Sequence, residues 1–221
     1  MTLLLYQLRL NLADRAVRRD LASAYEMHRT LSRAFVDSDQ GPVNPFLWRL
    51  EPSSGDQAPH VLLQSACEAR WSGLPTGYML SCQERRWDPA AVLHPGRRVA
   101  FRLRANPTVN RVPQSEGSAV TAGQSARGRR KRLGLWREAE QLEWLQRQAQ
   151  RVGLASVEAA VSEAERMRCR KHDGMITLAS AQFDGRAVIA DPVALVAGVC
   201  SGIGHGRMLG HGLLSLAPLR S

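Results

Sequence analysis

The stretch that decides the fold lies near the end of the chain and reads Gly202-Ile-Gly-His-Gly-Arg-Met-Leu-Gly-His-Gly212. Five of its eleven residues are glycine, and each glycine costs folding entropy that only an unusual backbone conformation or a close approach would justify. This segment, the glycine loop, therefore has a defined shape. Its exposed amides, with donors from His205, Arg207 and His211, suit an anion such as a phosphate. A tight turn that packs a helix onto a strand is the alternative, and the local sequence does not separate the two.

The residues around the glycine loop exclude two familiar nucleotide-binding motifs. Asp191-Pro192 ahead of Val193 to Val199 is typical of an N-cap and a first-turn proline that open an apolar helix. Dinucleotide and nucleoside-triphosphate loops follow a strand and open a helix. Here the glycines follow the helix and precede a strand at 213–219, and no Lys-Ser or Lys-Thr pair comes after them.

The composition favours a globular protein that binds a polyanion. With 221 residues, 44% of them hydrophobic, the chain is one large domain or two small ones with a real core. A formal net charge of +10 and a pI near 10.6 favour nucleic acid over a membrane surface, because no basic amphipathic helix is evident. No apolar run approaches the length of a membrane span, and residues 2–9 predict no signal peptide. Four dispersed cysteines predict reduced thiols in the cytoplasm, with neither a disulfide framework nor a metal site.

The first half of the chain predicts the order strand, helix, strand, strand, short helix, strand. Residues 6–12 alternate between apolar and polar, which is the period of a half-buried strand. A helix is expected from Arg18 to Val36, and any element at Cys67–Trp71 is short because Gly73, Pro75 and Gly77 follow it. The remaining strands are expected at Phe46–Leu50, Val61–Ser65 and Tyr78–Trp87.

The same order starts again after Pro95-Gly96. Residues 99–106 alternate, with an apolar face and a basic face that carries Arg102 and Arg104. Leu135 to Ala149 mark the buried face of a helix that is predicted to stop near Gly153. The segment 155–172 remains open between helix and strand. Ile176–Phe183, the turn pair Asp184-Gly185 and Arg186–Ala190 predict a hairpin. A helix at 193–201 and the strand at 213–219 complete an α+β chain of two tandem ferredoxin-like (RRM-like) β-α-β-β-α-β domains, residues 1–94 and 95–221.

His28 and Tyr25 are the candidate catalytic residues. They are three apart, so they are neighbours on one helix surface, at the border between an apolar and a basic face. An imidazole at such a border reaches a ligand while its pKa stays near neutrality, which proton transfer requires. The alternative is a border histidine that only packs its ring. His205 and His211 compete for the role, on a glycine-rich segment that we expect to be flexible.

A run of basic residues, Arg127-Gly-Arg-Arg-Lys-Arg132, carries five positive charges within an exposed loop at 113–132. Such a run is either solvated or, together with the basic face of the strand at 99–106, grips a phosphate backbone. Only 5% of residues are aromatic, so recognition of a duplex or hairpin by shape is favoured over base stacking. The candidate RNA-binding residues are Arg102, Arg104, Arg127, Arg129, Arg130, Lys131, Arg132, Gly204, Gly206 and Arg207.

The glycine loop is one of four segments that together resemble a known family, and these segments occur in the same order as in that family and span nearly the whole chain. The others are Val17-Arg-Arg-Asp-Leu-Ala-Ser-Ala-Tyr-Glu-Met-His-Arg-Thr-Leu31, Phe101-Arg-Leu-Arg-Ala-Asn-Pro107 and Lys131-Arg-Leu-Gly134. Together they resemble the CasE family, the endoribonucleases that process CRISPR RNA in type I-E systems. The chain departs from the family at Arg207, where a lysine is usual.

The resemblance implies a duplicated ferredoxin-like fold divided near Pro95. It also implies cleavage of the CRISPR repeat RNA at the 3′ base of its hairpin, without a metal ion or other cofactor. The ribose 2′-hydroxyl attacks the adjacent phosphate and leaves a 2′,3′-cyclic phosphate and a 5′-hydroxyl. His28 matches the family's catalytic histidine and Tyr25 its supporting tyrosine. The expected partners are the repeat RNA, the mature guide RNA and other subunits of the Cascade complex. A hairpin-binding protein without catalysis is the alternative function.

Overall fold

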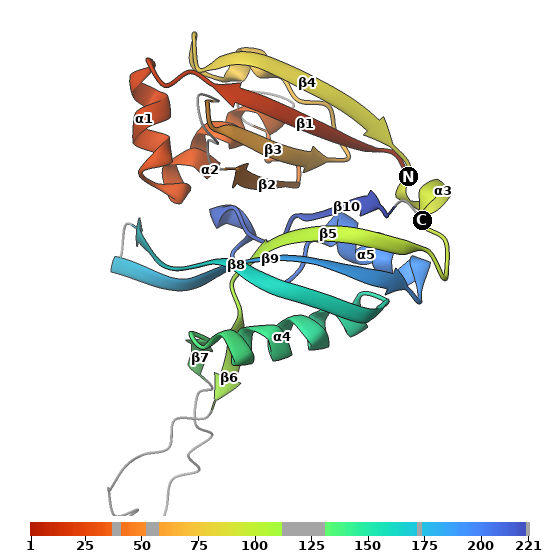
Figure 1. Cartoon of the computed structure of the whole chain (residues 1–221). Helices are drawn as coiled ribbons and strands as arrows, with labels where there is room; N and C mark the ends of the chain where they lie inside the picture. The colour runs from red at the N-terminus through yellow and green to blue at the C-terminus, as the bar shows by residue number, and fades with distance from the viewer. Residues whose placement is uncertain (37–40, 52–57, 112–130, 172–173, 220–221) are drawn as a thin grey trace, which may run out of the picture.

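The computed structural model describes residues 1–36, 41–51, 58–111, 131–171 and 174–219. Two four-stranded antiparallel sheets dominate it, one above the other in Figure 1. The first sheet has the order β2-β3-β1-β4 and the second the order β10-β5-β9-β8. The bounds in the first sheet are β1 Leu3–Leu10, β2 Phe46–Glu51, β3 His60–Ser65 and β4 Met79–Trp87. Those in the second are β5 Arg98–Ala105, β8 Leu154–Lys171, β9 Gly174–Ile189 and β10 Leu214–Pro218.

Each sheet has the topology of one ferredoxin-like unit. The first strand lies between the third and the fourth: β1 pairs with β3 and β4, and β5 pairs with β9 and β10. The first unit has the helices α1 (Arg15–Leu21) and α2 (Ala24–Ser32), and the second has α4 (Glu138–Arg151) and α5 (Pro192–Ser201). This confirms the α+β class and the tandem ferredoxin-like architecture. In the first unit, the helix that the β-α-β-β-α-β order requires between β3 and β4 is reduced to one 3-10 turn, η2 (Trp71–Gly73).

The apolar faces of the strands and helices form one core in each unit. Leu8, Leu31 and Leu63 are completely or almost completely buried in the first, as are Leu103, Phe183 and Val199 in the second. Helix α4 covers the side of the second sheet that faces away from the first unit (Figure 1). The polar face of β5, which carries Arg102 and Arg104, therefore lies toward the first unit.

The connection between the units runs through α3 (Pro89–Val92) and residues 93–97. The expected division between residues 94 and 95 falls in this connection and stays a prediction. A two-stranded ribbon of β6 (Thr108–Arg111) and β7 (Lys131–Gly134) leaves the second sheet after β5 (Figure 1). None of the described helices is long and apolar enough to cross a membrane.

The helix expected from Arg18 to Val36 is wrong as a single element. Its apolar periodicity is real, but Ser23 has an extended backbone and its hydroxyl accepts a hydrogen bond from the Glu26 amide, so a new helix begins there. The chain therefore forms α1, then α2, then the 3-10 turn η1 (Arg33–Phe35). The break turns α2 relative to α1 and gives the segment with Tyr25 and His28 a helix of its own.

The hairpin predicted at Asp184-Gly185 is also wrong, because both residues lie within the continuous strand β9. Gly185 is required by packing: a methyl group there would lie 2.5 Å from the Glu158 carbonyl oxygen and 2.8 Å from the Phe101 ring. The side chain of Asp184 is engaged by Arg102 and Ser162. The segment 155–172, left open above, pairs with β9 as strand β8 as far as Lys171 opposite Gly174.

Candidate active site

Helix α2 is held in place by a buried polar cluster behind it. Asp20 is 1% exposed and accepts a hydrogen bond of 2.8 Å from the Tyr78 hydroxyl. Arg19 forms an ion pair with Asp20 at 2.7 Å and donates to the Thr30 hydroxyl at 3.0 Å. Because Arg19 and Asp20 lie in the last turn of α1 and Thr30 lies in α2, these bonds fix the two helices against each other.

His28 lies on α2 with its ring partly buried. The ring stacks on Phe46 of β2, with 5.1 Å between centroids and 17° between planes, and Phe46 stacks in turn on Phe35. Its Nδ1 atom is buried and has no hydrogen-bond partner in the described part of the chain. Burial lowers the pKa of His28 below its ordinary value. The imidazole is therefore neutral and held in one orientation, and it retains a basic nitrogen for a proton.

Tyr25 precedes His28 by one helical turn and is partly buried on the same helix. The structure thus keeps both predicted catalytic residues on one element and one surface. Helix α2 contacts η3 (Arg207–Leu209), the short turn inside the glycine loop, and also contacts β8. Segments of the second unit therefore contact the helix that carries His28.

The glycine loop packs tightly against β2 of the first unit. Gly202 and Gly210 have φ of +75° and +79°. A methyl group at Gly202 would lie 2.8 Å from Leu47, and one at Gly210 would lie 3.0 Å from the Trp48 ring. Both glycines thus serve backbone conformation and close approach together. At these two positions the glycines therefore allow the loop to pack tightly against a strand, as the alternative to anion binding predicted.

The two histidines of the glycine loop have opposite surroundings. His211 is fully buried, its Nε2 lies 3.1 Å from the Ser180 hydroxyl, and burial with the nearby Arg104 lowers its pKa to about 4. The expectation that His211 lies on a flexible segment is wrong, because its side chain is buried and therefore cannot contact a bound RNA. His205 is exposed to solvent, but partial burial of its ring and the positive charges of Arg132 and Arg207 lower its pKa below the ordinary value.

A basic hollow of about 670 Å³ lies between α4, α5 and the glycine loop. It brings together Arg132, Gly204 and Arg207 of the predicted RNA-binding set, and Gly206 follows two residues after Gly204. Arg151 and His205 also line it. Such a concentration of donors and positive charge suits a phosphate group.

Arg102 and Arg104 lie apart from the basic hollow and already have acidic partners. Arg102 bonds Asp184 at 2.6 Å and Glu51 at 3.2 Å. Arg104 bonds Glu165 and the Ser180 hydroxyl. Their charges are largely compensated within the protein. Arg127, Arg129 and Arg130 lie outside the described residues, and of Lys131 only the backbone, paired with Arg111 in the β6–β7 ribbon, is described.

A second hollow of about 370 Å³, the helix hollow, lies between α1, α2, β8 and the glycine loop. Arg166 and Arg168 of β8 line it beside Met27 and Leu209. The sequence analysis missed both arginines because the segment 155–172 was left open. The signal was the alternation Glu165-Arg166-Met167-Arg168, which in a strand places both arginines on one face.

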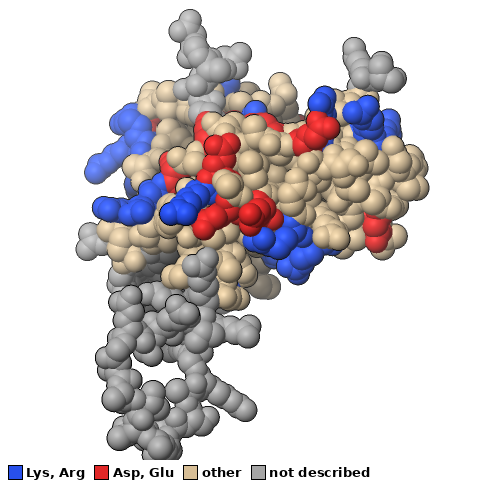
Figure 2. Space-filling model, turned by 60° about the horizontal axis from the view of Figure 1, so that its bottom comes forward, with Lys and Arg blue, Asp and Glu red and all other residues tan. Residues whose placement is uncertain are grey.

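Charged side chains on the face turned forward in Figure 2 form several separate basic groups with acidic side chains between some of them. The excess of positive charge is thus divided into local sites on this face. Among the described residues, no three or more His, Cys, Asp and Glu side chains gather closely enough to hold a metal ion.

Known proteins match the chain over nearly its whole length. A family model described as "CRISPR associated protein" matches residues 3–218. The "CRISPR-associated endoribonuclease Cse3" of Thermus thermophilus is 37% identical over 97% of this chain and 99% of its own length. The "CRISPR system Cascade subunit CasE" of Escherichia coli is 32% identical over 93% and 96%.

Solved structures agree with these matches. The structure of Thermus thermophilus Cse3 "bound to an RNA representing a pre-cleavage complex" has a TM-score of 0.82 and 36% identity, and the match covers 99% of this chain and 100% of that one. The Cas6e protein of Escherichia coli K-12 has a TM-score of 0.60 and 28% identity, with 99% and 100% covered. The chain belongs to this family of CRISPR-associated proteins.

Proposed function

We propose that the chain, as a CRISPR-associated endoribonuclease, cuts CRISPR repeat RNA at the 3′ base of its hairpin and keeps the mature guide RNA as a Cascade subunit. The observation that carries this proposal is the setting of His28. A neutral imidazole is fixed by Phe46 on a short helix, and this helix also contacts β8 and the glycine loop of the second unit. Relatives with the same fold are named for RNA cleavage and for Cascade.

The reaction we propose is a metal-independent transesterification. The 2′-hydroxyl attacks the adjacent phosphorus, the bond to the 5′-oxygen breaks, and a 2′,3′-cyclic phosphate and a 5′-hydroxyl result. His28 takes the proton of the 2′-hydroxyl as a general base or gives one to the departing 5′-oxygen as a general acid. Tyr25 orients the phosphate with its hydroxyl. The two proton roles of His28 remain alternatives.

Arg166 and Arg168 fit the charge that develops in this reaction. Negative charge grows on the phosphate oxygens as the 2′-oxygen attacks, and fixed positive groups stabilise it best in a partly enclosed site. Both arginines line the helix hollow beside α2. The guanidinium of Arg166 lies 4.5 Å over the ring of Trp136, just before α4, so Arg166 would have to leave this ring to reach a phosphate beside α2.

The hairpin is held, in this proposal, by the basic hollow and the basic run. Arg132, Gly204, Gly206 and Arg207 bind backbone phosphates, with Arg127, Arg129, Arg130 and Lys131 extending the surface. Arg102 and Arg104 contribute less, because acidic partners already engage them. We place the protein in the cytoplasm, where Cys67, Cys82 and Cys200 stay free thiols.

The test is incubation of the purified chain with its own CRISPR repeat RNA in EDTA. Cleavage to a 2′,3′-cyclic phosphate product is expected. RNA that is bound but stays intact with or without magnesium supports the alternative, a hairpin-binding protein without catalysis. Cleavage only after magnesium is added would contradict the metal-independent mechanism but would still show that the chain is an endoribonuclease.

A further inference from the structure

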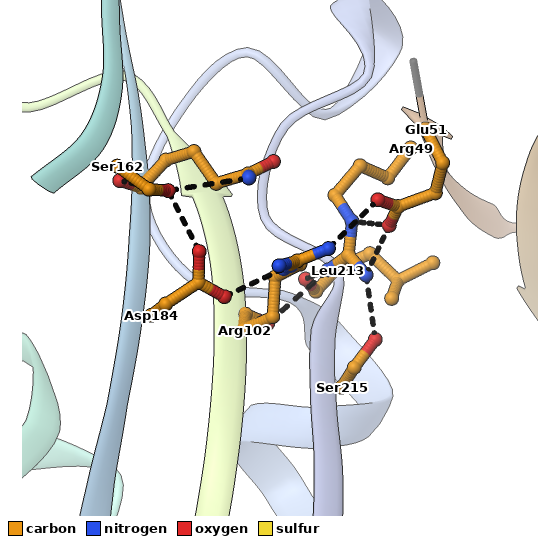
Figure 3. Close-up of polar contacts among 8 residues, drawn as sticks. Arg49, Glu51, Arg102, Ser162, Asp184, Leu213 and Ser215 are labelled. Atoms are coloured by element: carbon orange, nitrogen blue, oxygen red, sulfur yellow. Dashed lines mark hydrogen bonds and ion pairs between the residues drawn. The ribbon is translucent and has the colours of Figure 1, made fainter. Parts of the chain in front are cut away.

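Arg49 of β2 is an arginine that is 1% exposed and bonded to both units. Its guanidinium bonds Glu51 at 2.5 Å, the carbonyl oxygens of Arg102 and Leu213 at 3.1 Å each, and the Ser215 hydroxyl at 2.9 Å. Figure 3 shows these bonds converging on one side chain from β2, β5 and β10. A buried charge is costly unless its donors are satisfied, and three of these four partners belong to the second unit.

The charges around Arg49 balance one another. Glu51, 8% exposed at its side chain, bonds both Arg49 and Arg102. Arg102 also bonds Asp184, which accepts a hydrogen bond from Ser162. Two arginines and two carboxylates thus alternate across the boundary between the sheets (Figure 3). Arg49 offers no charge to an RNA, so any effect of Arg49 on cleavage acts through the protein.

Strand β2 connects this boundary to the candidate catalytic histidine. Four consecutive residues, Phe46 to Arg49, each meet a different neighbour. Phe46 supports the His28 ring, Leu47 lies against Gly202, and Trp48 lies against Gly210. Arg49 then bonds the carbonyl of Leu213, directly after the glycine loop. A shift of β2 against β10 would therefore move His28 relative to the glycine loop and the arginines of β8.

We propose that Arg49 is a positioning residue for RNA cleavage, which sets the place of His28 by fastening β2 to the second sheet. The inference rests on the proposed function. A second buried bond, from the Gln64 amide to the Val199 carbonyl at 2.7 Å, also joins the units but starts from β3. Arg49 differs because it lies on the strand that carries Phe46.

Two variants test the proposal. Arg49→Met removes the charge and all four hydrogen-bonded contacts, while Arg102 remains as a partner for Glu51. Arg49→Lys keeps the charge, but a single ammonium group does not reproduce the planar fork that reaches several acceptors at once. The matched control is Arg86→Met. Arg86 is an exposed arginine that bonds Glu68 and Glu84, both within the first unit.

The measurement is the single-turnover cleavage rate with saturating excess protein, together with hairpin affinity and melting temperature. Excess protein makes the rate insensitive to a small unfolded fraction. We expect Arg49→Met to cut about 10- to 100-fold more slowly, since small displacements of reacting groups cost rates of that order. Arg49→Lys should lie between this variant and the parent. Hairpin affinity should stay within about threefold for both, and Arg86→Met should cut at the parent rate.

Other outcomes overturn the proposal. If both Arg49 variants melt at lower temperature but cut at the parent rate, Arg49 only stabilises the fold. If Arg49→Met does not fold, the rate of Arg49→Lys decides, and a parent rate rejects the proposal. A loss of affinity equal to the loss of rate assigns Arg49 to RNA binding instead. A parent chain that leaves the RNA intact overturns the proposed function and this inference with it.

Discussion

The position and protonation of the His28 ring depend on its packing against another element, strand β2. Phe46 covers one side of the ring and burial keeps the imidazole neutral. We predict that His28→Ala cuts about 10²- to 10⁴-fold more slowly than the parent, the usual cost of losing a general acid or base. Hairpin affinity should barely change, because binding is spread over many phosphate contacts. Single-turnover rates and binding isotherms with repeat RNA check this.

The control variants for His28 are chosen from the structure. Tyr25→Phe keeps the ring and loses only the hydroxyl, so it should slow cleavage less than His28→Ala. His205→Ala removes the exposed histidine of the glycine loop and should cut near the parent rate. A dead His205 variant together with an active His28 variant would move the general acid or base to the glycine loop.

His211 predicts a specific pH dependence of stability. Its pKa is about 4 in the folded chain, against an ordinary value of 6.5, because it is buried and lies near Arg104. Between these values the unfolded chain binds the extra proton and the folded chain does not, so acidification favours unfolding. The contribution of neutral His211 to the free energy of unfolding is complete above about pH 6.5 and is lost as the pH falls toward 4. A shift of this size corresponds to roughly 3 kcal/mol.

Urea unfolding at several pH values measures this effect. The free energy of unfolding of the parent should fall between pH 6.5 and 4. In His211→Gln, which cannot titrate, the fall should be smaller by roughly 3 kcal/mol, whatever the stability of the variant at pH 7. Equal pH dependence in both proteins would show that His211 does not titrate in this window.

Periodicity predicted most helices and strands, and it was wrong where tertiary contacts decide. Alternation placed β1 and β5, and the Asp191-Pro192 start of α5 is capped as expected, because the Asp191 side chain accepts hydrogen bonds from the Val193 and Ala194 amides. Strand β8 was left open because its alanine and glutamate content favours a helix, whereas the repeated order requires a strand. The structure adds two irregularities in its pairing with β9. The pair Asp184-Gly185 is typical of a turn in sequence, but Gly185 is packed inside a strand. Local sequence does not contain the Phe101 ring that excludes a side chain there.

The glycine loop allows a test with a built-in control. Gly210 and Gly77 have nearly equal φ, +79° and +80°, so an alanine at either carries the same left-handed strain, about 1–2 kcal/mol. Only Gly210→Ala also presses on the buried Trp48 ring, because nothing lies within 4 Å of the added methyl at Gly77.

We predict that Gly210→Ala is the more destabilised variant and slows cleavage, whereas Gly77→Ala cuts at the parent rate. The reason is that Trp48 is adjacent to Leu47 and Arg49 in the strand that supports His28 through Phe46. Melting temperatures and single-turnover rates separate strain from displacement. Equal losses in both variants would mean that the glycine is needed only for its backbone conformation.

At the scale of the whole molecule, the proposed site draws on both units. The first supplies Tyr25 and His28, and the second supplies the glycine loop, the basic hollow and the arginines of β8. The sequence predicted both units and the candidate histidine. It gave no sign of the boundary between them, because Arg49 and Arg102 look like ordinary surface charges in alternating strands. Their partners, Leu213, Ser215 and Asp184, are more than 80 residues away along the chain.

The net charge of the chain leads to a prediction about salt. We expect Arg129, Arg130, Lys131 and Arg132, replaced together by alanine, to weaken hairpin binding and to flatten its salt dependence. Each phosphate contact that is lost leaves one counterion fewer to be released, so the slope of log affinity against log salt should shrink by up to about 3. The control, Arg86→Ala with Arg186→Ala, removes charges that Glu68, Glu84 and Glu158 already neutralise, so its slope should stay near that of the parent. Affinities from about 50 to 200 mM salt provide the comparison. An unchanged slope in the fourfold variant would mean that these four side chains, including Arg132 of the basic hollow, make no phosphate contact and that other residues hold the RNA.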